Sequence, residues 1–207
     1  MAYTRIKCLP LNAKHRIIYK LGYTRTEQFL VMLLIILIFF MKISFFGGVK
    51  SGKSRLAEKR IMSLAGKQKP YYLATNICLD EEMQQRIAEH RKRRGNRFET
   101  IEEPIDLLGV VKNCDRPVLI ECLTLWLNNM LFQQKESAKI LNILEETLKL
   151  PKEMVFVHNE VGFGIIPDNP LARQFVDLSG RAGQLLGHYC DEVYFCAAGI
   201  QLKMKPV

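Results

Sequence analysis

The sequence lacks the features that mark several classes of protein. Only 13 of its 207 residues are glycine and 8 are proline, and no repeat is visible, which excludes collagen-like and wholly disordered chains. Its six cysteines form no C-x-x-C pair, and no histidine stands at ligand spacing from them, so we expect no zinc site. Several of these cysteines lie in apolar runs, as reduced thiols do, which favours a cytoplasmic protein.

Strong charge of one sign is also missing from most of the chain. The formal net charge is +9, but residues 1–40 hold six Lys or Arg and a single acid, so the remainder carries only +4. That excess is too small to indicate nucleic acid as a partner, and we expect none.

The longest apolar run, residues 29–41, has 13 residues, whereas a membrane-spanning helix needs about 20. A basic stretch precedes this run, as in a signal peptide, but no small-residue cleavage site follows it. We therefore interpret residues 1–40 as an extension outside the fold, with Met41 as the true start of a single domain over 41–207, and expect no stable membrane insertion. A membrane-associating extension and an additional buried helix are the alternatives.

From Met41 onward, short apolar runs alternate with helical patterns. This alternation predicts an α/β domain with a mostly parallel sheet covered by helices on both faces. The expected strands are Ile43–Phe46, Tyr71–Thr75, Val118–Glu121, Met154–His158 and Glu192–Cys196. The expected helices are Ser54–Leu64, Asp80–Arg93, Leu123–Gln133, Ser137–Leu148 and Leu171–His188.

A phosphate-binding loop follows the first of these strands. The pattern G-x-x-x-x-G-K-S is complete between an apolar strand and a helix, the context that the motif requires. Backbone N–H groups of such a loop surround phosphate oxygens, while the lysine reaches the β- and γ-phosphates and the serine hydroxyl binds Mg²⁺. The residues of the loop are Gly47, Gly48, Val49, Lys50, Ser51, Gly52, Lys53 and Ser54. The loop predicts a P-loop NTPase fold and a nucleoside triphosphate, but not the acceptor of the phosphate.

A carboxylate at the end of a neighbouring strand is expected to organise the Mg²⁺. Glu121 ends the apolar strand Val118–Glu121, at the edge where ligands bind to such sheets. We therefore assign Ser54 and Glu121 to the metal site; the alternative is that Glu121 is only the polar end of a strand.

His90 stands at the start of an unusually basic stretch. Arg91, Lys92, Arg93 and Arg94 follow it directly, with Arg97 beyond. These cations would lower the pKa of the imidazole and leave it neutral and nucleophilic, and they would also hold phosphates beside it. The alternative is a solvated basic end of a helix, favoured by the helix dipole.

Taken together and in order, six segments resemble the bifunctional adenosylcobinamide kinase / adenosylcobinamide-phosphate guanylyltransferase family of cobalamin biosynthesis. The resemblance extends from Met41 to about Lys205. The segments are GGVKSGKS, YLATN (Tyr72–Asn76), LDEEMQQRIAEHR (Leu79–Arg91), LIECLTLWLNNML (Leu119–Leu131), NEVGFGIIPDNPLARQFVDLSGRAGQ (Asn159–Gln184) and DEVYFCAAGI (Asp191–Ile200).

The resemblance implies two reactions on a RecA-like P-loop fold. The hydroxyl of adenosylcobinamide takes the γ-phosphoryl group of ATP or GTP, and GMP from GTP then passes through a histidine to adenosylcobinamide phosphate. His90 matches the guanylylated histidine, four residues after Arg86, and Lys53 is the other catalytic residue. Nucleotide contacts implied by the family are the loop Gly47–Ser54, Ala74, Thr75, Asn76, Arg91, Lys92, Arg93, Arg94, Glu102 and Glu121. The family is oligomeric, commonly trimeric, so a homo-oligomer is expected.

Some positions leave alternatives open. Asn159 and Glu160 follow the fourth strand and suit contact with Mg²⁺ or substrate, or else form a capped turn. Glu102 is expected in a loop. The chain departs from the family pattern at Gly95, where proline is usual, at Phe98 and at Gly183. Rival hypotheses are a P-loop kinase of another small alcohol or nucleotide, and a membrane-tethered nucleotide-binding module.

Overall fold

The computed structural model describes residues 40–77, 88, 91–92 and 94–206. Residues 41–207 form one compact unit. Its strands are β1 (Lys42–Gly47), β2 (Tyr71–Ala74), β3 (Glu99–Glu102), β4 (Val118–Glu121), β5 (Met154–Asn159), β6 (Glu192–Ala197) and β7 (Ile200–Lys205). Its helices include α4 (Lys53–Ala65), the 3₁₀ turn η1 (Gly95–Arg97), α6 (Leu107–Asn113), α7 (Leu123–Phe132), α8 (Ser137–Lys149) and α9 (Pro170–Tyr189).

The seven strands form one sheet in the order β3-β2-β4-β5-β1-β6-β7. All neighbours pair in parallel except β6 and β7, which are antiparallel. The predicted α/β fold with a mostly parallel sheet is therefore confirmed. Because the parallel strands end at the same edge of the sheet, the segments that follow β1, β2, β4 and β5 gather there.

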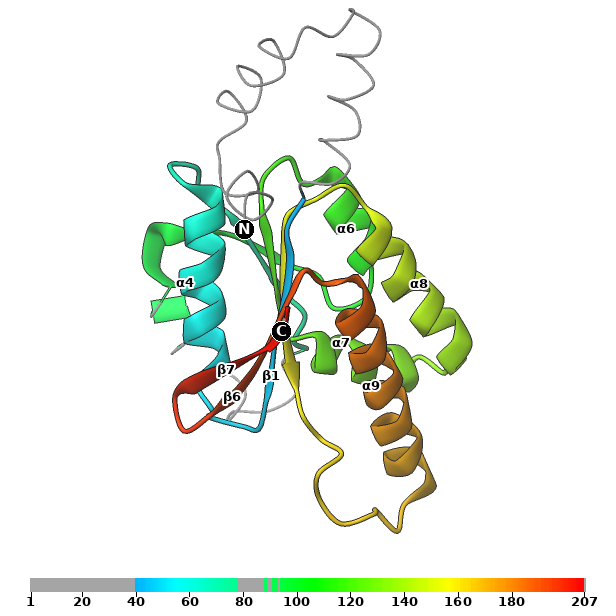
Figure 1. Ribbon diagram of the computed structural model, residues 1–207. Helices are drawn as coiled ribbons and strands as arrows, with labels where there is room; N and C mark the ends of the chain where they lie inside the picture. The colour runs from blue at the N-terminus through cyan, green and yellow to red at the C-terminus, as the bar shows by residue number, and fades with distance from the viewer. Residues whose placement is uncertain (1–39, 78–87, 89–90, 93, 207) are drawn as a thin grey trace, which may run out of the picture. The chain divides into compact units, whose positions relative to one another are not determined.

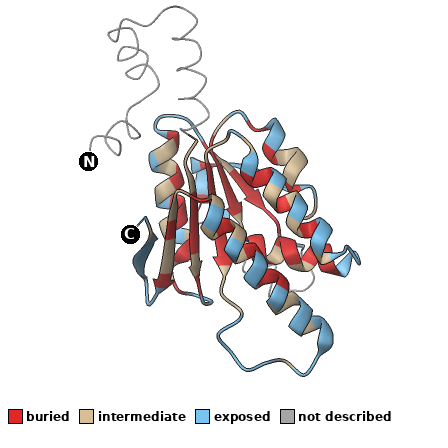
Figure 2. Ribbon diagram, turned by 45° about the vertical axis from the view of Figure 1, so that its right-hand side comes forward, coloured by how far each residue is buried: buried red, intermediate tan, exposed pale blue. Residues whose placement is uncertain are grey.

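Helices cover both faces of the sheet, as predicted (Figure 1). Helix α4 lies on one face, and α6, α7, α8 and α9 lie on the other. Alternate residues of β1 divide between the two sides: Ile43 and Phe45 pack in the core under α4, and Phe46 packs against the core under α7 and α9. Burial on both faces explains why the central strands are continuously apolar (Figure 2).

The five predicted strands are present to within one residue at each end, and four predicted helices are present with similar bounds. Helix α9 begins one residue earlier than expected, because Pro170 fits the first helical position and the Asn169 side chain accepts hydrogen bonds from the Leu171 and Ala172 amides at 2.8 and 3.1 Å. The expected helix Asp80–Arg93 lies largely outside the described residues. Within that range Ala88, Arg91 and Lys92 are helical, and so is the residue that follows it, Arg94.

Four elements were not predicted: the short turn η1, β3, α6 and β7. Strand β3 is a largely exposed edge strand with the sequence ETIE, so it lacks the apolar run that marks a buried strand. Glu102, expected in a loop, is in fact its last residue. Strand β7 forms the opposite edge and is also exposed, and α6 has only seven residues.

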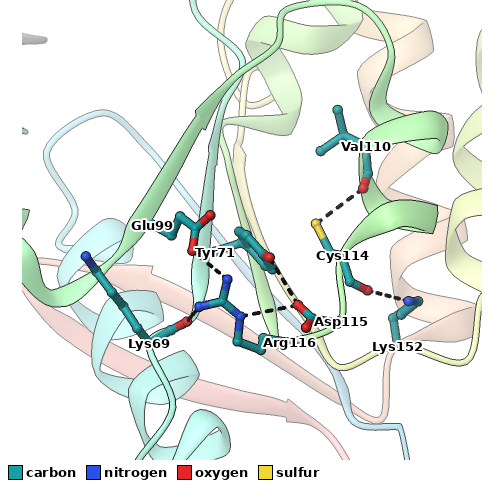
Figure 3. A network of polar contacts seen from close by, with 8 residues as sticks. All are labelled: Lys69, Tyr71, Glu99, Val110, Cys114, Asp115, Arg116 and Lys152. Atoms are coloured by element: carbon teal, nitrogen blue, oxygen red, sulfur yellow. Dashed lines mark hydrogen bonds and ion pairs between the residues drawn. The ribbon is translucent and has the colours of Figure 1, made fainter.

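Polar contacts around Arg116 join the strands at the edge opposite the P-loop (Figure 3). Its guanidinium donates hydrogen bonds to the Lys69 carbonyl at 2.7 Å and to the carboxylate of Glu99, and it lies 4.2 Å from the centre of the Tyr71 ring. The Tyr71 hydroxyl donates to Asp115 at 3.0 Å. One cation thus connects the amino ends of β2, β3 and β4.

In the part of the chain that the structure describes, no helix is both long and apolar enough to span a membrane.

Candidate nucleotide-binding site

The P-loop, Gly47–Ser54, connects β1 to α4 at the carboxyl edge of the sheet. Two of its glycines are required by the local geometry. Gly47 has φ +148°, and a Cβ there would lie 2.2 Å from the Cys196 carbonyl oxygen. Gly52 has φ +95°, a region that residues with a side chain rarely adopt. The backbone therefore needs both glycines to turn tightly before the helix begins.

The Lys53 side chain folds back over this loop. Its Nζ donates hydrogen bonds to the Gly48 carbonyl at 2.6 Å and to Ser51 Oγ at 3.3 Å, and the residue is only 5% exposed. Burial lowers the pKa of Lys53, although the neighbouring Cys122 and Glu121 act in the opposite direction. A phosphate that enters the loop would stabilise the charged form of Lys53, because its negative charge compensates for the water that the buried ammonium group has lost.

Ser54 and Glu121 meet beside the lysine. Ser54 Oγ donates a 2.6 Å hydrogen bond to Glu121 Oε1, so the first turn of α4 touches the carboxyl end of β4. A hydroxyl and a carboxylate are oxygen ligands of the kind that Mg²⁺ prefers, and Mg²⁺ usually completes its shell with water and substrate phosphates. The described residues contain no cluster of three or more His, Cys, Asp or Glu that could hold a metal unaided. The pair thus fits Mg²⁺ bound together with a nucleotide.

The end of β2 is tied to the end of β4 by Thr75. Its hydroxyl donates to the Cys122 carbonyl at 2.7 Å and accepts from the Cys122 amide at 3.0 Å. Asn129 adds a hydrogen bond to the Thr75 carbonyl at 2.7 Å. Ala74 is buried and Asn76 is partly exposed. Of the three residues predicted to contact the nucleotide here, Asn76 therefore presents the accessible side chain.

The basic residues after His90 occupy different environments. Arg94 is buried, 3% exposed, with its guanidinium 3.8 Å from the centre of the Tyr72 ring. Arg91 forms an ion pair with Glu102, and both side chains are more than half exposed. The structure thus brings together Arg91 and Glu102, which are predicted to share a nucleotide. His90 and Arg93 lie outside the described residues, and Lys92 is exposed.

His158 occupies a position that the sequence did not single out. It is buried near the end of β5, with Nε2 3.0 Å from Ser179 Oγ and Nδ1 3.4 Å from Thr124 Oγ1. Burial lowers its pKa to about 4, and the charge of Lys53 contributes in the same direction. A neutral imidazole therefore links α7 to α9 behind the P-loop. The periodicity of an apolar strand gives no signal for this role.

Asn159 and Glu160 lie next to the first glycine of the loop. Asn159 pairs with Gly47 in the β1–β5 register, and the Glu160 amide donates to the Gly47 carbonyl at 3.0 Å. The Glu160 carboxylate accepts a hydrogen bond from the Gly162 amide at 2.6 Å. Both residues are thus placed at the phosphate end of the site by the pairing of β5 with β1.

Comparison with known proteins identifies the family of the chain. Residues 43–204 match the family model described as cobinamide kinase / cobinamide phosphate guanyltransferase. The chain is 39% identical over 165 residues to the bifunctional adenosylcobalamin biosynthesis protein CobP of Pseudomonas aeruginosa, covering 77% of this chain and 94% of that one. It is 35% identical over 178 residues to the bifunctional adenosylcobalamin biosynthesis protein CobU of Escherichia coli, covering 77% and 97%. Among solved structures, the match to the flagellar accessory protein FlaH from Methanocaldococcus jannaschii covers 75% of this chain and 70% of that chain, with a TM-score of 0.42 at 11% identity.

Proposed function

The chain belongs to the cobinamide kinase / cobinamide phosphate guanyltransferase family, and we propose that it catalyses both reactions on adenosylcobinamide. The phosphorylation of its hydroxyl by ATP or GTP comes first, and transfer of GMP from GTP to the phosphorylated product follows. The observation that supports the proposal best is the P-loop itself, with Lys53 over the loop and Ser54 bonded to Glu121.

In the kinase reaction, these residues act mainly by positioning and by stabilising charge. The loop amides and the Lys53 ammonium hold the β- and γ-phosphates. When phosphate enters, Lys53 exchanges its contacts with Gly48 and Ser51 for phosphate oxygens, and its charge balances the negative charge that develops on the transferring group. His158 is neutral at pH 7, so Lys53 is not repelled by a second positive charge from this imidazole.

Mg²⁺ is part of the proposal, with Ser54 and Glu121 as the residues that would hold it, directly or through water. When bound, the ion would neutralise charge on the phosphate oxygens. Glu121 orients the Ser54 hydroxyl, and it occupies the strand end at which an acidic residue of P-loop enzymes usually stands.

For the guanylyl transfer we propose His90 as the nucleophile. Its imidazole attacks the α-phosphorus of GTP, pyrophosphate leaves, and the GMP then passes to adenosylcobinamide phosphate. The cations beside it support this role. Arg91, Lys92 and the buried Arg94 supply positive charge that favours both a neutral imidazole and a bound triphosphate.

The test is covalent labelling of the full chain with α-³²P-GTP and Mg²⁺, next to a His90→Ala variant. Label on the parent and none on the variant, with kinase activity retained by the variant, is the expected result. His15 lies in the extension, so a His15→Ala variant is the matched control and should label like the parent. Label that survives in His90→Ala would overturn the assignment of the nucleophile, and no label on the parent would leave only a P-loop kinase.

Two further parts of the proposal concern the state of the protein in the cell. We propose a homo-oligomer, since the edge strand β7 exposes Ile200, Leu202 and Met204 at 72%, 66% and 52%.

We also propose a cytoplasmic location, because the four described cysteines are free and buried thiols.

A further inference from the structure

A pocket of about 320 Å³ lies on the α9 side of the sheet, next to the P-loop. Its walls come from the end of β1 and β5, the segment that follows β5, one face of α9, and β6 and β7. The walls are largely apolar, with Phe46, Phe163 and Phe195 among the side chains that line it. A concave apolar site with a few polar groups is the usual form of a small-molecule site.

Two of the residues that line the pocket adjoin the first glycine of the P-loop. Phe46 lines it and immediately precedes Gly47, the first residue of the loop. Glu160 also lines it, and its amide is hydrogen-bonded to the Gly47 carbonyl. Both residues therefore place one end of the pocket at the residue where the P-loop begins.

The polar groups that line the pocket differ in how much hydrogen-bonding capacity they have left for a ligand. The ring nitrogens of His158 lie next to Ser179 and Thr124, so they are already engaged within the fold. The Glu160 carboxylate accepts one bond, from Gly162, and two carboxylate oxygens can accept several. Glu160 therefore has capacity left to accept a hydrogen bond from a hydroxyl.

The face of α9 that lines the pocket is left open by two glycines. Gly180 and Gly187 both line the pocket, and a Cβ at either one would meet no atom of the described residues within 4 Å. The space beside them is thus not needed for packing among these residues, which is what a binding site requires.

Next to the pocket, the segment between β5 and α9 exposes large apolar side chains. Phe163, Ile165 and Ile166 are 81%, 97% and 79% exposed. Apolar groups at this exposure mark a surface that is covered in the working state. They extend the apolar wall beyond the pocket, as a ligand larger than the pocket would need.

Building on the proposed function, we infer that this pocket binds the phosphoryl acceptor: the hydroxyl-bearing arm enters the pocket, and the macrocycle lies on Phe163, Ile165 and Ile166. The acceptor is a bulky alcohol whose hydroxyl-bearing arm would lie against the apolar wall of the pocket. In the transfer, the acceptor oxygen forms a bond to the γ-phosphorus while its proton passes to the Glu160 carboxylate. The bond from the γ-phosphorus to the bridging oxygen breaks, and the nucleoside diphosphate leaves.

The decisive variant is Gly180→Val, because Gly180 lines the pocket and an added Cβ meets no atom of the described residues within 4 Å, so the valine takes up space at the pocket wall without displacing a neighbour. Kinase assays with adenosylcobinamide and ATP should show a KM for adenosylcobinamide raised about tenfold or more, with the KM for ATP changed less than twofold. Gln174→Val is the control, since it places the same side chain on an exposed part of α9 away from the pocket. Circular dichroism melting should give the same midpoint or a higher one for Gly180→Val, as glycine is a poor helix former.

A second variant tests the role of Glu160. Glu160→Gln keeps an oxygen for the Gly162 amide but cannot take a proton, so kcat should fall about 10²-fold with little change in either KM.

The outcomes separate the possible failures. If the parent does not phosphorylate adenosylcobinamide, the proposed function fails. If the parent does so and Gly180→Val has an unchanged KM for adenosylcobinamide, the pocket assignment is wrong. Light scattering on each variant gives the third outcome: loss of activity together with a change of oligomeric state would show that a second copy of the chain covers this surface instead, and would also overturn the assignment.

Discussion

The hydroxyl of Ser54 and the carboxylate of Glu121 are joined by a 2.6 Å hydrogen bond across 67 residues of sequence. Ser54 lies in the first turn of α4, and Glu121 is the last residue of β4. Because β5 lies between β1 and β4 in the sheet, this bond links the loop after β1 to a strand that is not its neighbour. It is therefore a product of the tertiary fold, and it positions the two oxygens that would receive Mg²⁺.

Replacing Glu121 by Gln should lower kcat for the kinase reaction by about 10²-fold. The amide oxygen of Gln can still accept from the Ser54 hydroxyl, so the local structure persists, whereas the negative charge that favours the metal is lost. The Mg²⁺ concentration needed for half-maximal activity should rise, and a titration of activity against Mg²⁺ measures it. An unchanged Mg²⁺ requirement would show that Glu121 is only the polar end of a strand.

Replacing Lys53 by Ala should reduce kinase and guanylyl transfer activity by about 10²- to 10³-fold each, because both use the same triphosphate cradle. The variant removes a buried ammonium group together with its bonds to Gly48 and Ser51. Parallel assays of both reactions check it, with the exposed Lys112 replaced by Ala as the control. If guanylyl transfer survived while kinase activity was lost, the two reactions would use separate triphosphate sites.

Replacing Thr75 by Val should destabilise the fold by about 2–3 kcal/mol, since it removes two hydrogen bonds and leaves the Cys122 amide and carbonyl without this partner. Urea unfolding measures the loss. Thr147→Val is a matched control, because Thr147 is also fully buried but its hydroxyl donates only to the Ile143 carbonyl within α8. That change should cost less than about 1 kcal/mol, and equal losses at both positions would contradict the link between β2 and β4.

The lowered pKa of His158 predicts a loss of stability in mild acid. In the unfolded chain His158 is protonated below its ordinary pKa of 6.5, whereas in the folded chain it is protonated only below about pH 4. The unfolded state therefore holds more protons in this window, and the free energy of unfolding falls as the pH drops from 6.5 to 4. The contribution of His158 is about 3 kcal/mol over that range, and it is fully retained above pH 6.5.

Unfolding free energies at pH 7 and pH 4.5 provide the measurement, compared between the parent and a His158→Gln variant. The variant should show the smaller dependence on pH, because its side chain does not titrate. His188→Gln, at an exposed position late in α9, should retain the dependence of the parent. A His158→Gln variant that loses as much stability in acid as the parent would show that other groups are responsible.

The elements that were predicted well from the sequence are those whose burial is continuous. β1, β4 and β5 are covered on both faces, so their apolar runs are unmistakable. β3 and β7 are exposed edge strands, and ETIE and IQLKMK carry no such run. The position of Glu102 was mistaken for this reason: only the pairing of β3 with β2 makes it a strand end, beside Arg91.

Local spacing was enough to predict the P-loop, the family and the parallel α/β architecture. Each depends on glycines at fixed positions, on a lysine and serine at the start of a helix, or on the alternation of apolar and helical segments. Ser54 and Glu121 were expected at one site from the motif and the strand end, and the fold joins them by a hydrogen bond. The two hydrogen bonds of Thr75 to Cys122 and the burial of His158 became known only from the folded chain, because they depend on strand order, which local patterns do not encode. The pocket beside Gly180 arises for the same reason: it exists only where α9 passes over the ends of β1 and β5.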